Sequence, residues 1–501
     1  APSVAGICER VDGLPLAIEL AAARVKLFNP QALLARLETS AAVLGAGSRD
    51  LPGRQQTLMG AIAWSYDLLD DSHRRLFSRF SAFARGANLE QAESVCGPES
   101  ELGVDVLTGL DELADQSLMR RMPDYEEPRL LMLHVIREYA ADRLRDSGEE
   151  AAIRDRHAAA YQALAEAAAP HLFGAEQKTW LDRLDLDHDN FRAAFDWSIS
   201  RGDVARALCL GAAFWRFWQM RGHLREGRTR IESIIAMPRV DEHPDELERA
   251  LEAAGGITYW QGDIAATQAY YDRCLVLARA SGDQRRIANA LYNASFPFQV
   301  TRQDPAQGKV LLEEALPIYR QLGDDSGIAQ CLWGLGQCQF RLNDFAAAIP
   351  TIDESIQLFR RLGNQFGLGW ALFVRSIIAI YVDDLDEAKS KALEALQIFS
   401  RADDVSGAVL VLNGLAEVIR RQGDRIRAAT LAGAASAQEV SSGATLGTVL
   451  GSREGWRMSL EDLTGAEAAA RAEGQAMTFQ QAVAYALGGA TKPEAAAGAS
   501  D

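Results

Sequence analysis

Residues that could perform chemistry are sparse in this sequence, and none of them forms a recognisable active site. A phosphate-binding loop needs Gly-x4-Gly-Lys-Ser/Thr, because its backbone amides and its lysine surround the phosphates. Gly308-Lys309-Val310 lacks the hydroxyl residue and the first glycine, and Lys178-Thr179 lacks the preceding glycine. No HExxH, GxSxG or paired-histidine pattern indicates another reaction. We therefore expect no catalytic residue and no catalysis by this chain alone.

Metal binding is also not expected, because the cysteines are dispersed. Zinc sites place cysteines or histidines in close pairs such as CxxC, and no such pair occurs here. Cys331 and Cys338 lie seven positions apart on one predicted helix face, where small buried thiols are the simpler interpretation. We interpret all six cysteines as free thiols in a reducing cytoplasm: Cys8, Cys96, Cys209, Cys274, Cys331 and Cys338.

The charge balance bears on which partners the chain binds. The formal net charge is −17 at pH 7, whereas nucleic-acid binding needs clustered cations that displace counterions from phosphates. DNA contact is therefore disfavoured. No stretch of about 18 apolar residues predicts a membrane helix, and the most apolar run, 371–382, contains Arg375 and fits a buried helix. The chain starts at Ala1 without an initiator methionine or a signal sequence, so we expect a cytoplasmic piece of a longer protein.

Turn residues recur at a nearly constant spacing in the second half of the sequence. A Gly or Asn suits the left-handed end of one helix, and a following Asp can cap the next helix. The spacing of 20 or 21 residues predicts one helix per interval and a helical hairpin of about 40 residues as the repeating unit. The turns are Gly262-Asp263, Gly282-Asp283, Gln303-Asp304, Gly323-Asp324, Asn343-Asp344, Gly363-Asn364, Asp383-Asp384, Asp403-Asp404 and Gly423-Asp424.

Columns of small residues support this repeat, because two helices approach closely only where such residues lie. Eleven and four positions beyond every second turn, the residues are small in all five units: Cys274, Ala315, Ser355, Ala395 and Ala435, and Thr267, Gly308, Ala348, Ala388 and Ala428. The neighbouring apolar column is replaced by Ser436 in the fifth unit, as expected of a terminal repeat. We predict an array over 246–440, followed by capping helices and a flexible tail over 441–501.

The repeat resembles the tetratricopeptide repeat in Leu332, Leu335-Gly336, Ala348, Ile352 and Ser355, with a longer period than the usual length of about 34. Such arrays bind partners on their concave surface. The resemblance therefore implies that a protein, a peptide or a small effector binds there. The candidates for this contact, chosen by their location in the predicted helices, are Tyr292, Trp333, Trp370 and Arg375.

Near the start, Gly13-Leu14-Pro15-Leu16-Ala17 marks a turn followed by a helix. This string resembles the GLPLA motif of the signal-transduction ATPases with numerous domains, a class that includes NB-ARC proteins and LuxR-like regulators of actinobacterial type. In that family the proline packs beside the adenine of a bound nucleotide, so the resemblance implies this role for Pro15. Because the P-loop core is missing from this sequence, ATP or ADP is implied only for the intact protein, and no cofactor for this chain.

The next segment, 51–148, is similar to the winged-helix domain of the same family, notably in Trp64-Ser65-Tyr66-Asp67-Leu68-Leu69 and in 75–83. The family often carries Met-His-Asp at the end of this domain, where the histidine reaches the nucleotide's phosphate. Here Leu133 stands at the His position and His134 at the Asp position. His134 is therefore a candidate for nucleotide contact, and a plain surface or interdomain role is the alternative.

A winged helix can also bind DNA through cationic side chains. The candidates Arg74, Arg75, Arg79 and Arg85 alternate with Phe77, Phe80 and Phe83. Because these three rings should face a core, we expect an intramolecular clamp rather than a DNA reader.

Between 149 and 245 the sequence predicts helices that carry many aromatic residues. Gly202-Asp203 followed by Ala207 echoes the repeat turn, so this segment is either a helical connector or a divergent first repeat. A connector core is favoured over an aromatic cofactor site for Phe191, Phe195, Trp197, Phe214, Trp215, Phe217 and Trp218.

These features predict an all-α chain: a winged-helix-like segment followed by an α-α superhelical solenoid of tetratricopeptide type. Its parts would be the end of a nucleotide-binding domain (1–50), a winged-helix-like domain (51–148), a connector (149–245), the repeats (246–440) and the cap and tail (441–501). By resemblance, the chain is the sensor and clamp of an ATP/ADP-switched transcriptional regulator whose N-terminal nucleotide-binding domain is missing here. Two alternatives stay open: a non-enzymatic scaffold for protein–protein interaction, and the C-terminal regulatory part of a multidomain enzyme such as a nucleotide cyclase.

Overall fold

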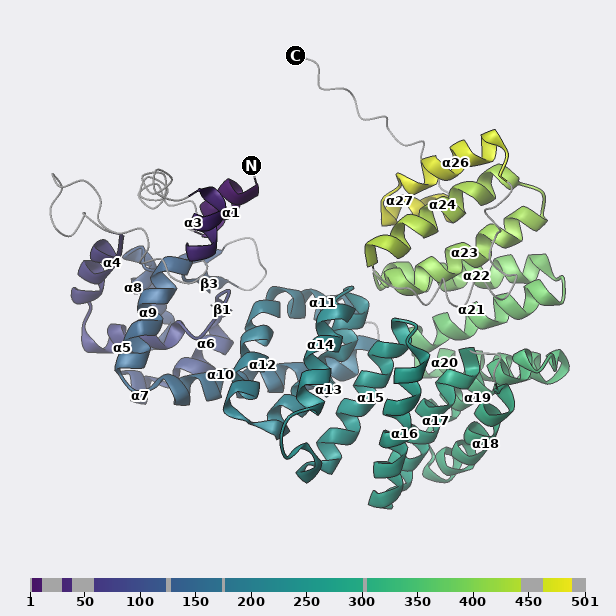
Figure 1. The fold of residues 1–501 in the computed structure, drawn as a ribbon, viewed down its shortest axis with the longest axis horizontal. Helices are drawn as coiled ribbons and strands as arrows, with labels where there is room; N and C mark the ends of the chain where they lie inside the picture. Colours follow the sequence, from purple (N-terminus) through teal and green to yellow (C-terminus); the bar gives the residue numbers. More distant parts are fainter. Residues whose placement is uncertain are drawn as a thin grey trace, which may run out of the picture. The chain divides into compact units, whose positions relative to one another are not determined.

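The computed structural model describes residues 2–10, 29–37, 58–122, 128–173, 176–300, 304–442 and 463–488, which are helical apart from one small sheet (Figure 1). Two compact units are present: Ala1–Leu164 with Leu186–Arg201, and Ala165–Asp185 with Gly202–Asp501. The predicted class, all-α with a helical-repeat solenoid, is confirmed. None of the described helices is long and apolar enough to span a membrane.

The first unit combines short helices with a three-stranded antiparallel sheet in the order β1-β3-β2. Its strands are β1 (Ala87–Asn88), β2 (Arg120–Met122) and β3 (Arg129–Leu131). Its helices are α1 (Pro2–Arg10), α3 (Pro30–Leu37), α4 (Leu58–Asp67), α5 (Asp71–Phe80), α6 (Leu89–Cys96), α7 (Glu99–Leu102), α8 (Val106–Asp115), α9 (His134–Asp146), most of α10 (Glu150–Ala168) and α12 (His188–Arg201). Ala87 pairs with Leu130, and Arg121 pairs with the same residue from the other side.

The core of the first unit contains aromatic rings that lie in and just after α5. Phe77, Phe80 and Phe83 are at most 1% exposed, as their alternation with arginines predicted. A buried carboxylate, Asp187, accepts hydrogen bonds from side chains on four other parts of this unit, so the charge is compensated where water is excluded. Its donors are Gln91 (2.6 Å), Arg129 (2.7 Å), Asn190 (3.0 Å) and Tyr161 (3.1 Å).

The second unit is a succession of antiparallel helical hairpins. It comprises η3 (Ala169–Phe173), α11 (Gln177–Leu186), α13 (Val204–Met220), α14 (Leu224–Ile235), η4 (Val240–Glu242), α15 (Pro244–Trp260), α16 (Ile264–Ser281), α17 (Gln284–Val300), α18 (Pro305–Leu322), α19 (Asp325–Arg341), α20 (Phe345–Leu362), α21 (Gln365–Tyr381), α22 (Leu385–Arg401), α23 (Val405–Arg421), α24 (Arg425–Ser442), α26 (Gly465–Gln475) and α27 (Phe479–Ala486). From α15 to α24 each helix packs on the next one in the chain.

The turn chemistry predicted from the sequence sets this succession. Gly323 has φ +63° and ends α18, and the carboxylate of Asp324 accepts the backbone N–H of Gly327 at 3.0 Å. The same pair of roles recurs at later turns, where Asn343, Asp383 and Asp403 adopt the left-handed conformation without being glycine. These three residues belong to the types that tolerate this conformation best.

The small-residue columns lie where helices meet. Both columns are buried in all five units, and Ala315, Ser355 and Ala395 have no exposed surface. Beyond α24 the array is covered by α26, and this contact depends on two glycines. A Cβ at Gly433 would lie 2.1 Å from the carbonyl oxygen of Arg471, and one at Gly474 would lie 1.9 Å from that of Thr430.

Candidate ligand-binding cavity

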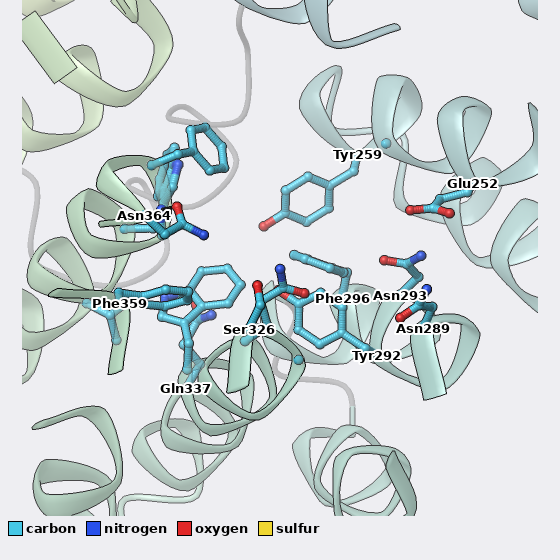
Figure 2. A pocket seen from close by; sticks show the side chains of 18 of the residues that line it. Glu252, Tyr259, Asn289, Tyr292, Asn293, Phe296, Ser326, Gln337, Phe359 and Asn364 are labelled. Atoms are coloured by element: carbon cyan, nitrogen blue, oxygen red, sulfur yellow. Dashed lines mark hydrogen bonds between the residues drawn. The ribbon is translucent and has the colours of Figure 1, made fainter. Parts of the chain in front are cut away.

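A cavity of roughly 390 Å³ lies inside the second unit. Most of its wall comes from α13, α15, α17, α19 and α21, which are the first helices of successive hairpins. Figure 2 shows Tyr259 reaching toward the middle of the cavity, with Glu252, Asn289 and Asn293 on one side and Asn364 on the other.

Aromatic side chains make up much of this wall. Phe296 connects three of them, since its ring centroid lies 5.3 Å from Tyr259, 5.1 Å from Tyr292 and 5.9 Å from Trp333. The aromatic lining consists of Trp215, Tyr259, Trp260, Tyr271, Tyr292, Phe296, Tyr319, Trp333, Phe340, Phe359, Phe366, Trp370 and Phe373. Rings provide a large apolar contact area with few rotatable bonds, which favours a fixed binding shape.

Helices that are far apart in sequence meet across the cavity. Trp260 of α15 and Trp370 of α21 form an edge-to-face pair with ring centroids 5.4 Å apart. The guanidinium carbon of Arg216 on α13 lies 5.2 Å from the ring centroid of Phe366 on α21. Successive repeats therefore curve enough for early and late helices of the array to enclose the cavity together.

Two charged side chains, Arg216 and Glu252, line the cavity and are partly buried. The guanidinium of Arg216 also lies 3.9 Å from the ring centroid of Trp215, so rings of two helices hold it. Burial lowers the pKa of Arg216 to about 10, although Tyr271 and Glu252 oppose that change. Burial raises the pKa of Glu252, against a hydrogen bond from Asn293 and the charge of Arg216.

The other charged lining residues hold the helices together. Arg285 of α17 forms an ion pair with Asp324, the cap of α19. Arg341 of α19 donates to the backbone carbonyl oxygen of Gln299 on α17. These contacts fix the spacing of two neighbouring helices in the wall.

Two indole N–H groups in the wall are buried without a hydrogen-bond acceptor among the described residues: Nε1 of Trp333 and Nε1 of Trp370. An indole nitrogen can only donate, and a buried unpaired donor costs about 1–3 kcal/mol. A ligand acceptor atom that reached either nitrogen would relieve this cost.

The structure brings three of the four predicted partner-binding residues to one site. Tyr292, Trp333 and Trp370 line the cavity. Arg375 does not line it, because its guanidinium is buried between helices, 3.2 Å from Asp353 and 2.6 Å from Glu387. Its contacts are those of a residue that holds α20, α21 and α22 together. Whether the three aromatic residues bind a partner stays a prediction.

The nucleotide-contact candidates lie elsewhere in the chain. Pro15 and the rest of the Gly13–Ala17 string lie outside the described residues. His134 is the first residue of α9, with Nε2 3.2 Å from a carboxylate oxygen of Glu138 and Nδ1 3.4 Å from Arg137. These local contacts orient the imidazole but leave its role toward a nucleotide untested.

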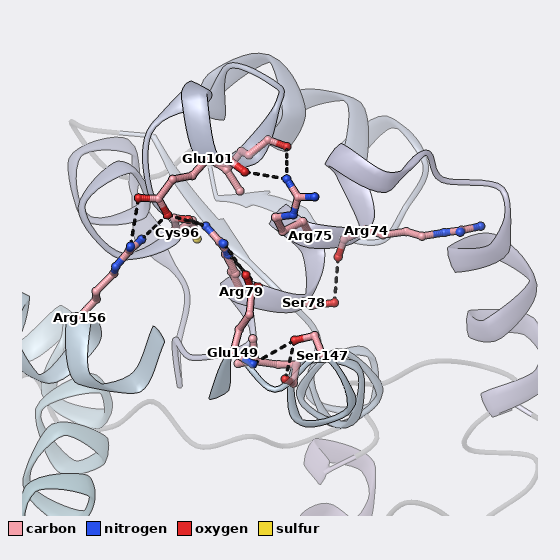
Figure 3. Close-up of polar contacts among 11 residues, drawn as sticks. Arg74, Arg75, Ser78, Arg79, Cys96, Glu101, Ser147, Glu149 and Arg156 are labelled. Carbon is pink, nitrogen blue, oxygen red and sulfur yellow. Dashed lines mark hydrogen bonds and ion pairs between the residues drawn. The ribbon is translucent and has the colours of Figure 1, made fainter. Parts of the chain in front are cut away.

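Three of the four arginines considered for DNA contact, Arg74, Arg75 and Arg79, make internal interactions, and Figure 3 shows those of Arg75 and Arg79. Arg85 is largely exposed and lies 3.3 Å from Asp189. Arg79 is 6% exposed, donates to the carbonyl oxygen of Cys96 at 2.6 Å and pairs with Glu149 at 2.7 Å. Arg75 donates to the carbonyl oxygen of Glu101 at 2.6 Å. Arg74 donates to the carbonyl oxygen of Asp67 at 2.7 Å, so all three guanidiniums take part in holding this unit together.

No family model matches the chain. Comparison with known proteins does give relatives. Proteins named as HTH-type transcriptional regulators in Mycobacterium bovis and Mycobacterium tuberculosis are 32% identical over 347 residues, or 68% of this chain. An uncharacterized Mycobacterium tuberculosis protein is 33% identical over 158 residues, which covers 31% of this chain and 40% of that protein. The match spans 39% of the length of the regulators.

Solved structures with a similar arrangement include a signal-transduction ATPase with a tetratricopeptide repeat sensor from Pyrococcus horikoshii. It is 13% identical, with a TM-score of 0.43, and the match covers 85% of this chain and 68% of that one. A Rap protein in complex with competence and sporulation factor is also 13% identical, with a TM-score of 0.38 over 61% of this chain and 97% of that one.

Several lining residues were not selected from the sequence, although a positional signal exists for them. The residues nine places beyond the caps of α15, α17, α19 and α21 are Glu252, Tyr292, Trp333 and Phe373. Those thirteen places beyond are Gly256, Phe296, Gln337 and Ile377, and the same count from Asp203 reaches Arg216. Residues four apart share a helix face, so these two columns mark the cavity wall.

The aromatic cluster of the connector divides between two roles. Phe214, Phe217 and Trp218 are at most 1% exposed and form a core, as predicted for a connector. Trp215 lies in the cavity wall instead. Gly202, with φ +69°, and the Asp203 cap give α13 the same start as the repeat helices. Like the first helices of the later hairpins, α13 therefore presents one face to the cavity, and Trp215 lies on it.

Proposed function

We propose that this chain is the sensory part of a regulatory protein, in which the repeat array binds a small effector or a short peptide in its central cavity. The observation that carries this proposal is the cavity itself, with an aromatic wall and desolvated charges drawn from five helices. Protein interiors are otherwise closely packed, and concave aromatic sites with a few polar groups are the usual form of ligand sites.

The likeness to mycobacterial proteins named as transcriptional regulators supports a regulatory role. By the resemblance in Gly13–Ala17, the intact protein would carry an ATP/ADP-binding domain before this chain, and the first unit would serve as a winged-helix clamp. We propose no catalysis by the chain itself, because its sequence contains no phosphate-binding loop.

Binding in the cavity would be linked to the geometry of the array. An occupant touching α13, α15 and α21 at once stabilises the arrangement in which these helices are close. A ligand shifts an equilibrium only through different affinities for its two states, and contacts that exist only in the closed arrangement supply that difference. This is a physical basis for passing occupancy on to the rest of a regulator.

The proposal is tested by filling the cavity. A collection of small metabolites and short peptides would be screened against the full chain by tryptophan fluorescence, with hits confirmed by calorimetry. Ser326 lines the cavity, so Ser326→Phe should weaken binding of every hit by about tenfold or more through lost space. Ser233→Phe, at an exposed position of α14, is the matched control and should leave affinity unchanged.

Hits that bind both variants equally would place the site elsewhere. If the screen yields no hit among the metabolites or the peptides, the sensor proposal is contradicted. That result would favour a scaffold that binds whole proteins on its outer surfaces.

A further inference from the structure

We infer that the occupant of the cavity is a small organic monocarboxylate with an apolar, ring-containing body, whose carboxylate pairs with Arg216 while its body packs against the rings of α15 and α17. This inference rests on the proposed function, because it names the ligand class of the same site. Three independent features carry it: the size of the cavity, the charge of its wall, and the way in which Arg216 is held.

The size of the cavity favours a compact molecule. Its volume of roughly 390 Å³ lies near the lower end of the range of about 300–1,000 Å³ found for small-molecule sites. Trp260 and Trp370, which both line the cavity, are in ring contact with each other. A compact ring-containing molecule fits such a space better than an extended peptide, which needs an open groove along its length.

The charge of the wall favours an anion. The whole chain has a formal net charge of −17, yet the cavity is lined by three arginines and two carboxylates. Arg285 is paired with Asp324, and Arg341 donates to a backbone carbonyl. The other two charged side chains of the wall are Arg216 and Glu252, and burial raises the pKa of Glu252. A positive wall in an acidic protein selects anions.

Arg216 has the geometry of a carboxylate receptor. Its guanidinium carbon lies 3.9 Å from the ring centroid of Trp215 and 5.2 Å from that of Phe366, and its Nη1 donates to Oε1 of Gln219 at 3.4 Å. A planar guanidinium held in this way can donate two parallel hydrogen bonds to a carboxylate. Because desolvation lowers the pKa of Arg216 to about 10, the group stays cationic near pH 7 but under-stabilised, so an incoming anion gains more than it would at the surface.

The apolar part of the occupant has a matching surface. Tyr259, Tyr292 and Phe296 form a continuous set of ring contacts on α15 and α17. Offset and edge-to-face contacts with these rings favour an aromatic or cyclic body over a flexible chain.

The test compares molecules of one shape and different charge. Indole-3-acetate and phenylacetate would be titrated into the full chain by calorimetry, beside their neutral amides and the corresponding amines. We expect the affinity of each acid to exceed that of its amide by about tenfold or more. Each amine should bind more weakly than the amide. In Arg216→Gln the acid should lose this advantage while the affinity of the amide changes little.

Two variants keep the test specific. Arg216→Lys retains the charge without the fork geometry, so it should keep only part of the preference for the acid. Arg273→Gln removes an exposed arginine that pairs with Asp241 and should leave the preference intact. If Arg216→Gln does not fold, the ratio of acid to amide affinity in the unaltered chain and in Arg216→Lys decides.

Amides that bind as tightly as acids would overturn the anion inference and leave the sensor proposal standing. The same conclusion would follow if neutral metabolites or peptides bind in the earlier screen while the acids fail to bind at millimolar concentration. Failure of all three chemical series and of that screen would remove the sensor proposal as well.

Discussion

At the scale of single residues, Asp404 shows how burial changes the chemistry of a repeat position. It caps α23 by accepting the backbone N–H of Gly407 at 3.0 Å, as Asp324 and Asn364 do for α19 and α21. Asp404 is only 1% exposed, and its second carboxylate oxygen has no hydrogen-bond partner among the described residues. Burial raises its pKa to about 6, although the charge of Arg216 and the cap hydrogen bonds oppose the shift.

This raised pKa predicts that Asp404 lowers the stability of the fold by an amount that depends on pH. A free Asp titrates near a pKa of about 3.9, so between about pH 4 and pH 6 the folded chain binds more protons than the unfolded chain, and stability falls as pH rises. Above that window the full cost of a buried carboxylate is present. Asp404→Asn keeps the cap, since Asn364 already serves this role, and should raise the free energy of unfolding near pH 7 by about 1–3 kcal/mol.

The measurement is urea unfolding of the full chain across the pH range, followed by tryptophan fluorescence. The gain in Asp404→Asn should disappear near pH 4, where the folded wild-type carboxyl is protonated. Asp344→Asn alters an exposed cap in the same array and should change stability by less than about 0.5 kcal/mol at any pH. A loss of stability in Asp404→Asn near neutral pH would mean that attraction to Arg216 outweighs desolvation.

At the scale of helical elements, three successive hairpins share one close contact. Gly327, Gly367 and Gly407 lie in the first turn of α19, α21 and α23, and each faces an aromatic ring of the preceding helix. A Cβ would lie 2.1 Å from the Tyr319 ring, 2.4 Å from the Phe359 ring and 2.7 Å from the Phe399 ring, respectively. The glycines therefore serve helix approach and not backbone conformation.

Gly327→Ala should destabilise the array by about 1–3 kcal/mol, because a well-packed ring must move to admit the added methyl group. This cost exceeds the gain in helix propensity of about 1 kcal/mol that Ala offers over Gly. Gly465→Ala is the matched control, since its Cβ would meet nothing within 4 Å and stability should not fall. Thermal unfolding of both variants gives the comparison, and equal midpoints would show that the Tyr319 ring shifts at little cost.

The sequence predicts the hairpins well and the cavity only in part. The difference arises because lining the cavity depends on which face of its helix a residue occupies. Turn pairs and small-residue columns repeat because every hairpin solves the same packing problem. The wall positions do not repeat in residue type: Glu252, Tyr292, Trp333 and Phe373 are equivalent by count but differ in chemistry. Arg375 was chosen by location, yet it lies two residues from Phe373, which is more than half a turn around α21.

At the scale of the whole array, closure depends on curvature accumulated over several repeats, which no local pattern records. In a solenoid each repeat contacts its neighbours, and small rotations add up along the chain. The result here is that α13 and α15 reach α21, through Arg216 with Phe366 and Trp260 with Trp370. The side chain of Lys178 adds an ion pair with Asp403 at 3.1 Å. An exposed pair of this kind contributes little, so we assign most of the closure to the ring contacts.

This assignment makes the Trp260–Trp370 pair the place where closure can be loosened. An aromatic pair contributes about 0.5–1.5 kcal/mol beyond its buried area, which corresponds to roughly a two- to tenfold change in an opening equilibrium. Trp260→Leu should therefore speed hydrogen exchange of backbone amides in α21 by such a factor, although α21 is distant in sequence. Trp197→Leu removes a tryptophan of α12 in the first unit, whose indole N–H donates to Asp155 at 2.7 Å, and should affect exchange near α12 but not in α21. If exchange in Trp260→Leu changes only in α15 and the helices adjacent to it in the chain, the cavity is held closed by the stacking of neighbouring repeats and not by contact across it.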